Sequence, residues 1–168
     1  MKNIVVASFN SGKNYFLRGL TLISAIHRTS FDSVDKIIIY NLGFSAKLKN
    51  FLESIEKVEV VEYPEYLNSI YPDYLNPGMF AWKCFILADA QKYNANIFYI
   101  DGGVAPINDL KEIFEIIEKE EIFVVGNTKE HTIRKWTQAK CLDILKIQQD
   151  ELDLPMISAG IIGYKSKG

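Results

Sequence analysis

An aspartate and two glycines, Asp101, Gly102 and Gly103, directly follow the apolar run "IFYI". A carboxylate at the end of a buried strand is costly to desolvate unless it meets backbone N–H groups, a lysine or a divalent cation. Glycines allow tight turns and also let a ligand come close to the backbone. Two interpretations stay open: an Asp-Gly turn whose carboxylate caps its own loop, and a binding site for a charged ligand.

A lysine upstream favours the binding site. Lys83 falls in the first turn of the helix predicted for Ala81 to Tyr93, which leads into the strand before Asp101. A cation there is unfavourable for the helix dipole, whereas a charge-assisted contact with an anion is worth about 1.5–3 kcal/mol. The alternative is a solvated surface lysine. Trp82 beside it is expected mainly to pack in the core.

The elements that position these residues are predicted to alternate between strands and helices along the chain. Short β-branched runs predict strands, and apolar residues at i, i+3, i+4 and i+7 predict amphipathic helices. We expect strands at Asn3–Ala7, Lys36–Tyr40, Val58–Glu62, Ile97–Ile100, Ile122–Val125 and Met156–Tyr164, and helices at Tyr15–Arg28, Ser45–Ile55, Ala81–Tyr93, Leu110–Lys119 and most of Lys129–Leu145. This order predicts an α/β fold, with a mainly parallel sheet and helices on both faces.

Polar residues gather after the predicted strands, where such sheets bind ligands. They are Ser8 to Asn10, Asn41, Tyr63, Asp101 to Gly103, Asn127, and Ser158 to Gly160. The segment from Tyr63 to Phe80 is rich in Pro, Tyr and Asn and cannot form one regular helix. Its Tyr66, Tyr71 and Tyr74 either stack on a ligand or fill space under the loop. For His131 and Trp136, an exposed histidine and a packed tryptophan are favoured over contact with a ligand.

The composition indicates one ordinary globular domain. The chain has 168 residues, 48% of them hydrophobic and 24% charged. The net charge of −2 argues against general nucleic-acid binding. Cys84 and Cys141 lack metal-ligand spacing and indicate reduced thiols. We find no signal peptide or membrane-length apolar stretch, and expect a cytoplasmic protein without a transmembrane segment. Peripheral attachment to a membrane stays open.

The sequence lacks several familiar motifs for nucleotide binding, nucleophilic catalysis and zinc binding. "FNSGKNYF" has only Gly12 before Lys13, and Asn14 stands where a phosphate loop needs Ser or Thr. No GxGxxG follows the first strand, which weakens a dinucleotide site. No Ser-His-Asp set is visible. Two histidines, His27 and His131, are too few and too far apart for a zinc site.

The block "FAWKCFILADAQKYNANIFYIDGGV" resembles glycosyltransferases of the GT-A fold, in which a helix with an early lysine precedes a strand ending in Asp-x-Asp. The later segment "ISAGIIGYK" is similar to the strand that returns beside the acidic motif in nucleotide-sugar transferases. With the Ser-Phe-Asn end of the first strand, the resemblance covers most of the chain. It implies a Rossmann-like GT-A fold and a single nucleotide-sugar-binding domain over residues 1–168.

The resemblance also implies a donor site. Its residues would be Ser8, Phe9, Asn10, Asn41, Lys83, Asp101, Gly102, Gly103, Ser158, Ala159 and Gly160. Phe9 would lie near the base or ribose, Lys83 on the ribose or phosphate, and Asp101 on the ribose or a metal. The two glycines would lie under the diphosphate, and Ser158 to Gly160 beside the transferred sugar. A Mn²⁺ or Mg²⁺ ion on Asp101 would neutralise the departing diphosphate.

Two departures bear on these expectations. Gly103 takes the place of the second Asp of Asp-x-Asp, so the usual chelating carboxylate is missing and the implied metal affinity falls. The chain stops at Gly168, soon after the returning strand, while the family's chains continue. We therefore expect a fragment, a minimal version truncated at the C-terminus, or an inactive relative.

The resemblance implies transfer of a sugar from a nucleotide-diphosphate donor to a glycan or other hydroxyl acceptor. One alternative is an inactive GT-A-like domain that binds a nucleotide or glycan. The other is a nucleotide-binding α/β domain with a different chemistry.

Overall fold

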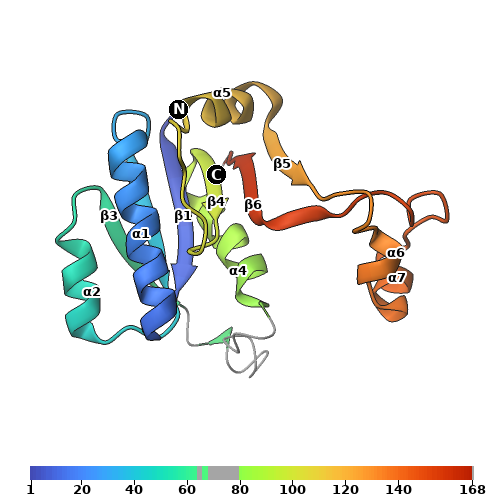
Figure 1. Cartoon of the computed structure of the whole chain (residues 1–168), viewed down its shortest axis with the longest axis horizontal. Helices are drawn as coiled ribbons and strands as arrows, with labels where there is room; N and C mark the ends of the chain where they lie inside the picture. The colour runs from blue at the N-terminus through green and yellow to red at the C-terminus, as the bar shows by residue number, and fades with distance from the viewer. Residues whose placement is uncertain (64–65, 68–79, 168) are drawn as a thin grey trace.

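Six strands form one mixed sheet in the computed structural model, which describes residues 1–63, 66–67 and 80–167 (Figure 1). Its order is β3-β2-β1-β4-β6-β5. The strands are β1 (Asn3–Phe9), β2 (Lys36–Asn41), β3 (Val58–Glu62), β4 (Asn96–Ile100), β5 (Ile122–Gly126) and β6 (Ile157–Lys165). All six lie close to the ranges predicted from the sequence.

The sheet is mainly parallel, as predicted, with one exception. β1 pairs in parallel with β2 and β4, and β2 pairs in parallel with β3. β6 runs antiparallel to both β4 and β5. The reason lies in the segment 127–156, which does not lead the chain back to the opposite edge of the sheet. β6 therefore begins at the edge where β4 and β5 end.

The helices also follow the predicted order. They are α1 (Lys13–Thr29), α2 (Ala46–Glu53), α4 (Trp82–Asp89) with a 3₁₀ turn η1 (Ala90–Tyr93), α5 (Lys111–Glu120), α6 (Ile133–Trp136) and α7 (Ala139–Leu145). The Ser45 side chain accepts a hydrogen bond from the Leu48 N–H and so caps α2. The segment predicted to be mostly helical, Lys129–Leu145, instead forms two short helices. Extended backbone at Thr137 separates them, and they stand away from the sheet (Figure 1).

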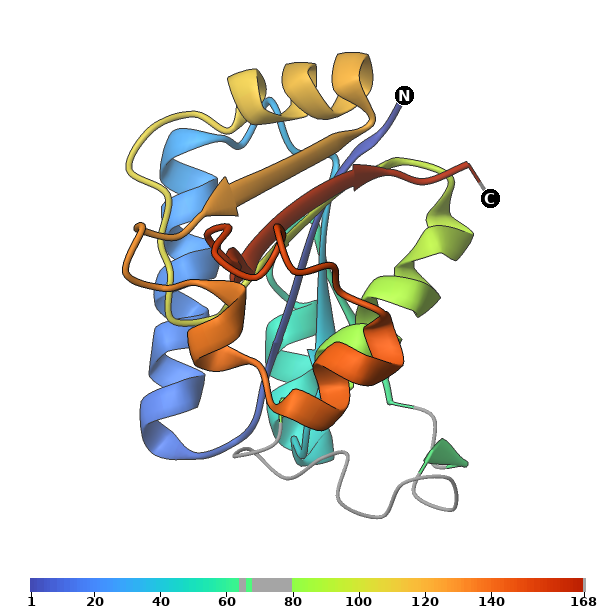
Figure 2. The same cartoon turned by 90° about the vertical axis from the view of Figure 1, so that its right-hand side faces the viewer.

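Helices cover both faces of the sheet, which confirms the predicted architecture (Figure 2). On one face, residues of α1, α2 and α5 pack against Val5 and Ala7 of β1. On the other face, Trp82 and Ile86 of α4 pack against Ile4 and Val6. Because the central strands are buried on both sides, they are continuous apolar runs. In the described residues, no helix has the length and apolar character to cross a membrane.

The connections change direction at β1. From β1 the chain moves outward to β2 and β3, then crosses to β4 on the other side of β1. In open α/β sheets, the carboxyl ends of two such neighbouring strands flank a crevice that binds ligands. The topology therefore places the candidate site at the ends of β1 and β4.

Candidate functional site

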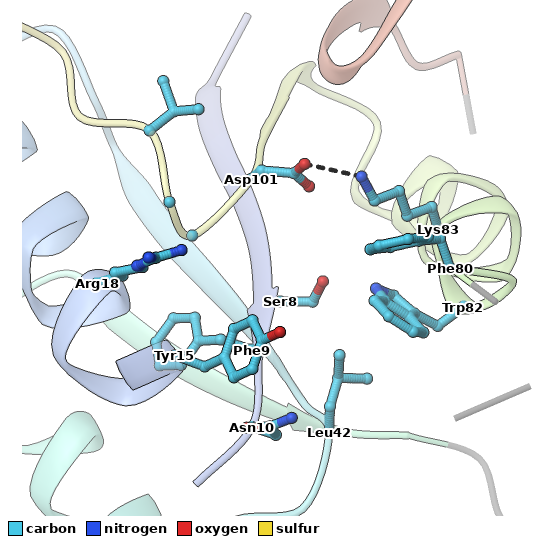
Figure 3. A pocket seen from close by; sticks show the side chains of 13 residues that line it. Ser8, Phe9, Asn10, Tyr15, Arg18, Leu42, Phe80, Trp82, Lys83 and Asp101 are labelled. Carbon is cyan, nitrogen blue, oxygen red and sulfur yellow. Dashed lines mark hydrogen bonds and ion pairs between the residues drawn. The ribbon is translucent and has the colours of Figure 1, made fainter. Parts of the chain in front are cut away.

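A cavity of about 320 Å³ opens at the carboxyl ends of β1 and β4 (Figure 3). The end of β1, the start of α1, the start of α4 and the loop after β4 contribute its walls. The lining residues are Ser8, Phe9, Asn10, Tyr15, Arg18, Leu42, Phe80, Trp82, Lys83, Asp101, Gly102, Gly103 and Val104. Many of the residues predicted from strand ends therefore come together here.

An ion pair joins Lys83 and Asp101 in the cavity wall. Lys83 Nζ lies 2.8 Å from Asp101 Oδ2, and its side chain is only 15% exposed. The same ammonium lies 3.5 Å from the carbonyl oxygen of Ala159 in β6. Lys83 is thus not a solvated surface residue. The partner that Asp101 required is a lysine, and the pair faces the cavity.

Tyr99 holds the other oxygen of the carboxylate. Its hydroxyl donates to Asp101 Oδ1 at 2.8 Å and lies 3.4 Å from Ser8 Oγ. Tyr99 and Asp101 are two residues apart on a strand, so their side chains share a face of the sheet. Burial first, and then the charge of Asp101, raises the pKa of Tyr99 well above its ordinary value. Tyr99 therefore stays a neutral donor that fixes the carboxylate.

Glycines bring the backbone of β6 close to Asp101 and the backbone of the loop after β4 close to Phe9. A Cβ atom at Gly160 would lie 2.9 Å from Asp101 Oδ2, and one at Gly102 would lie 3.3 Å from the Phe9 ring. The N–H of Asp101 donates to the Gly160 carbonyl at 2.9 Å, and the Val104 N–H donates to the Asp101 carbonyl at 2.9 Å. The loop does turn at Asp101, but the carboxylate serves Lys83 and Tyr99. Gly102 and Gly160 are glycines because a side chain at either position would crowd Phe9 or Asp101.

Phe9 forms the floor of the cavity. Its side chain is 4% exposed and packs against the rings of Phe16 and Phe44, at 6.2 and 5.3 Å between centroids. A Cβ atom at Gly19 of α1 would lie 2.4 Å from the Phe9 ring. The ring is thus mainly core, and the face it offers to a ligand is small.

Other predicted site residues lie around this cavity. Ser8 is 8% exposed, and the Asn10 side chain accepts a hydrogen bond from the Gly12 N–H at 2.9 Å. Asn41 is not among the lining residues; its Nδ2 donates to Glu62 at 2.8 Å and its amide oxygen accepts from the Gly43 N–H at 2.8 Å. The next residue, Leu42, lines the cavity instead.

The start of β6 lies beside the pair, although it is not part of the cavity lining. Gly160 and Ala159 contact Asp101 and Lys83 as described above. Ser158 precedes them on the same strand and is half-buried.

Sequence reasoning missed several lining residues, of which Arg18 matters most. Arg18 and Tyr15 lie on α1, three residues apart on one side of the helix, and both border the cavity. The helical spacing gave a usable signal, because α1 follows the strand that ends at the site. Phe80 was also missed. It has a left-handed backbone (φ 52°), and the Lys83 ammonium lies 5.3 Å from its ring centroid.

Two further aromatic predictions have different outcomes. Trp136 is 58% exposed and stacks on His131 with ring centroids 5.4 Å apart. The expected packed tryptophan is therefore wrong, because α6 has no sheet beneath it. Tyr66 is described and exposed, whereas Tyr71 and Tyr74 lie outside the described residues.

The residues around Asp101 do not suit a divalent cation. Mn²⁺ and Mg²⁺ prefer several oxygen ligands, and no group of three or more His, Cys, Asp or Glu residues in the described part of the chain could hold a metal. Among the described residues that line the cavity, Asp101 supplies the one carboxylate. Both of its oxygens already accept hydrogen bonds, and an ammonium stands 2.8 Å from one of them. Metal chemistry at Asp101 is thus not supported by this donor set.

No protein-family model and no curated protein matches the chain. Among solved structures, apo xyloside xylosyltransferase 1 of mouse matches with a TM-score of 0.63 at 12% identity, over 98% of this chain and 67% of that one. The galactosyltransferase LgtC, in complex with donor and acceptor sugar analogs, matches with a TM-score of 0.66 at 12% identity, over 98% and 58%.

Core-mannan synthase A from Aspergillus fumigatus, in its Mn/GDP form, matches with a TM-score of 0.56 at 9% identity, over 98% of this chain and 59% of that one. The chain thus spans between 58% and 67% of the length of these three proteins. At such low identity the comparison establishes the fold. The chain has the Rossmann-like GT-A fold of nucleotide-sugar transferases, as the resemblance implied.

Proposed function

We propose that this chain transfers a sugar from a nucleotide-diphosphate donor to a glycan or another hydroxyl acceptor, with residues 1–168 acting as a single nucleotide-sugar-binding domain. The observation that carries the proposal is the half-buried Lys83–Asp101 pair, which faces a cavity at the β1–β4 crevice. The GT-A fold of the sugar transferases supports it, as does the LgtC complex with donor and acceptor sugar analogs.

Each side of the cavity suits a different part of the donor. The Lys83 ammonium and the side-chain-free backbone at Gly102 and Gly103 suit the diphosphate, because amides and cations bind phosphate oxygens. The Asp101 carboxylate suits a ribose hydroxyl. Beside the Lys83–Asp101 pair, the start of β6, Ser158 to Gly160, would border the transferred sugar. In this assignment Asn41 orders the neighbouring loop.

The chain's own charges would assist the reaction electrostatically. When the bond between the sugar carbon and the diphosphate oxygen breaks, the diphosphate keeps the electron pair and gains negative charge. Lys83 is already oriented by Asp101, at 2.8 Å, and by the Ala159 carbonyl, at 3.5 Å. A preoriented cation stabilises such charge without reorganising during the reaction.

A release assay tests the proposal. UDP-, GDP- and CDP-sugars are incubated with the protein and a set of hydroxyl acceptors, and the nucleoside diphosphate formed is measured. We expect release with one donor, and a loss of about 10- to 100-fold in Lys83→Met. Lys119→Met is the matched control, because Lys119 is exposed in the last turn of α5. That helix lies at the opposite end of the sheet from the carboxyl end of β1 (Figure 1).

The outcomes separate the alternatives. Donor binding without release would identify an inactive nucleotide-binding domain. Failure to bind any nucleotide sugar or nucleoside diphosphate would overturn the proposal and leave only the fold.

A further inference from the structure

The charges that line the cavity are unusual for a site expected to hold a metal. Arg18 and Lys83 are cationic, and Asp101 is the one anionic side chain among the described lining residues. Lys83 compensates Asp101 at 2.8 Å. One positive charge therefore remains, on Arg18, and the described lining leaves no carboxylate free to attract a divalent cation.

Arg18 stands across the cavity from Lys83, and its guanidinium points toward the segment that follows Asp101 (Figure 3). A Cβ atom at Gly103 would meet only the Arg18 Cδ, at 4.0 Å, within contact range. The space beside Gly103, where the resemblance expects a second carboxylate, thus opens toward an arginine. In the described part of the chain, the Arg18 side chain takes part in no hydrogen bond or ion pair.

We propose that Arg18 and Lys83 bind the two phosphates of a nucleoside diphosphate from opposite sides of this cavity, so that binding needs no divalent cation. This inference rests on the proposed function and names the groups that would neutralise the leaving group. Arginine suits the role because its planar guanidinium donates two parallel hydrogen bonds to a phosphate. Lys83 supplies a point charge whose position Asp101 fixes.

Electrostatics favours this arrangement over a metal on Asp101. A divalent cation on Oδ2 would lie close to the Lys83 ammonium and would be repelled by it. A diphosphate brings its own negative charge into a site with net positive charge, and a cleft focuses that attraction.

Calorimetric titration tests the inference on the whole chain. UDP, GDP, CDP, ADP and dTDP are titrated at low salt, first with EDTA and then with MnCl2. We expect the same Kd for the bound nucleotide in both buffers. Arg18→Gln should weaken that binding about 10- to 100-fold in both, because one charge-assisted contact is lost. Binding of the matching nucleoside, which has no phosphates, should not change.

The matched control is Arg28→Gln. Arg28 is exposed in the last turn of the same helix, at the end remote from the cavity. Its substitution should leave the Kd unchanged. Both variants carry one charge fewer, so a difference between them reports the position of the charge and not the net charge.

Three results would overturn the inference. The first is a wild-type Kd that tightens tenfold or more with Mn²⁺, and the second is an Arg18→Gln variant that binds like Arg28→Gln. The third is Mn²⁺ alone binding stoichiometrically, as seen by EPR, and losing that binding in Asp101→Asn. In each case nucleotide binding remains and the proposed function stands. Failure of every nucleoside diphosphate to bind would remove both.

Discussion

The Lys83–Asp101 pair should stabilise the fold as well as prepare the site. Lys83→Met removes the ammonium and keeps an apolar stem, and Asp101→Asn removes the charge and keeps the shape. Each single change leaves one charge facing the cavity without its ionic partner. Among the described residues, Asp101 then keeps the hydrogen bond from the Tyr99 hydroxyl, at 2.8 Å, and Lys83 keeps the Ala159 carbonyl, at 3.5 Å. The double variant removes both charges together.

The burial of the pair sets the expected magnitude. Exposed ion pairs contribute about 0.2–1 kcal/mol, and breaking a buried pair costs about 3–5 kcal/mol. Lys83 is 15% exposed and Asp101 is 37% exposed, so this pair lies between the two limits. We therefore expect a coupling energy of about 1–2 kcal/mol from the double-mutant cycle.

Urea unfolding of the four proteins at neutral pH and low salt measures this coupling. A parallel cycle on Arg134 and Asp153, an exposed pair at 3.0 Å, should give a smaller value. A coupling energy at Lys83–Asp101 no larger than that of the exposed pair would refute the reasoning. It would mean that the ammonium and the carboxylate are both solvated, and the preoriented cation of the proposed mechanism would be lost.

Two further predictions concern the frame around the site. Gly19→Ala should lower the free energy of unfolding by about 1–2 kcal/mol, because overpacking against the Phe9 ring, 2.4 Å from the new Cβ, outweighs a helix-propensity gain of about 0.5–1 kcal/mol. Ser24→Ala, on an exposed face of the same helix, is the control; equal stability of Gly19→Ala and wild type would contradict the packing. Burial first, then Glu59 and Asp89, raises the pKa of Tyr93 to about 12. The neutral phenol therefore stabilises the native state fully below about pH 10, its unfolded pKa, and that stabilisation is lost as the pH rises toward 12. Urea unfolding across this range should show a smaller decline in Tyr93→Phe than in wild type, and an identical decline would show that Tyr93 is not responsible.

The strand ends could be predicted from the sequence, and with them much of the site. Runs such as "NIVVA" and "NIFYI" are apolar at nearly every position because both faces of β1 and β4 are covered. A polar residue follows each run and marks its carboxyl end. Because the carboxyl ends of parallel strands meet at one edge of a sheet, the sequence alone assigns Ser8 and Asp101 to that edge. Lys83 followed from its position in the first turn of α4, the helix that precedes β4.

Side chains on the walls could not be predicted in the same way. Arg18 reaches the cavity only because α1 packs over Phe9 through Gly19, and that contact joins residues from different elements. Asn41 sits at a strand end like Ser8, but its side chain bonds the loop that follows it. Position at a strand end therefore indicates nearness to a site, and the direction of the side chain depends on tertiary contacts.

The segment 127–156 shows where local pattern fails. Its apolar residues have helical spacing, and yet Ile144 and Leu145 are 68% and 64% exposed. Without a sheet to pack against, α6 and α7 remain short, and the chain enters β6 from the carboxyl edge. The local sequence does not predict the break at Thr137 or the antiparallel direction of β6, because both depend on contacts between distant parts of the chain.

Backbone NMR during titration with a nucleoside diphosphate tests most directly whether this edge of the sheet binds an anionic ligand. We predict that the largest amide shifts appear at Ser8, Lys83, Gly102 and Gly103, and that Arg18→Gln reduces them. Shifts centred instead on the smaller cavity beside Tyr40 and Asp89, or no shifts with any of the nucleotides, would contradict the account.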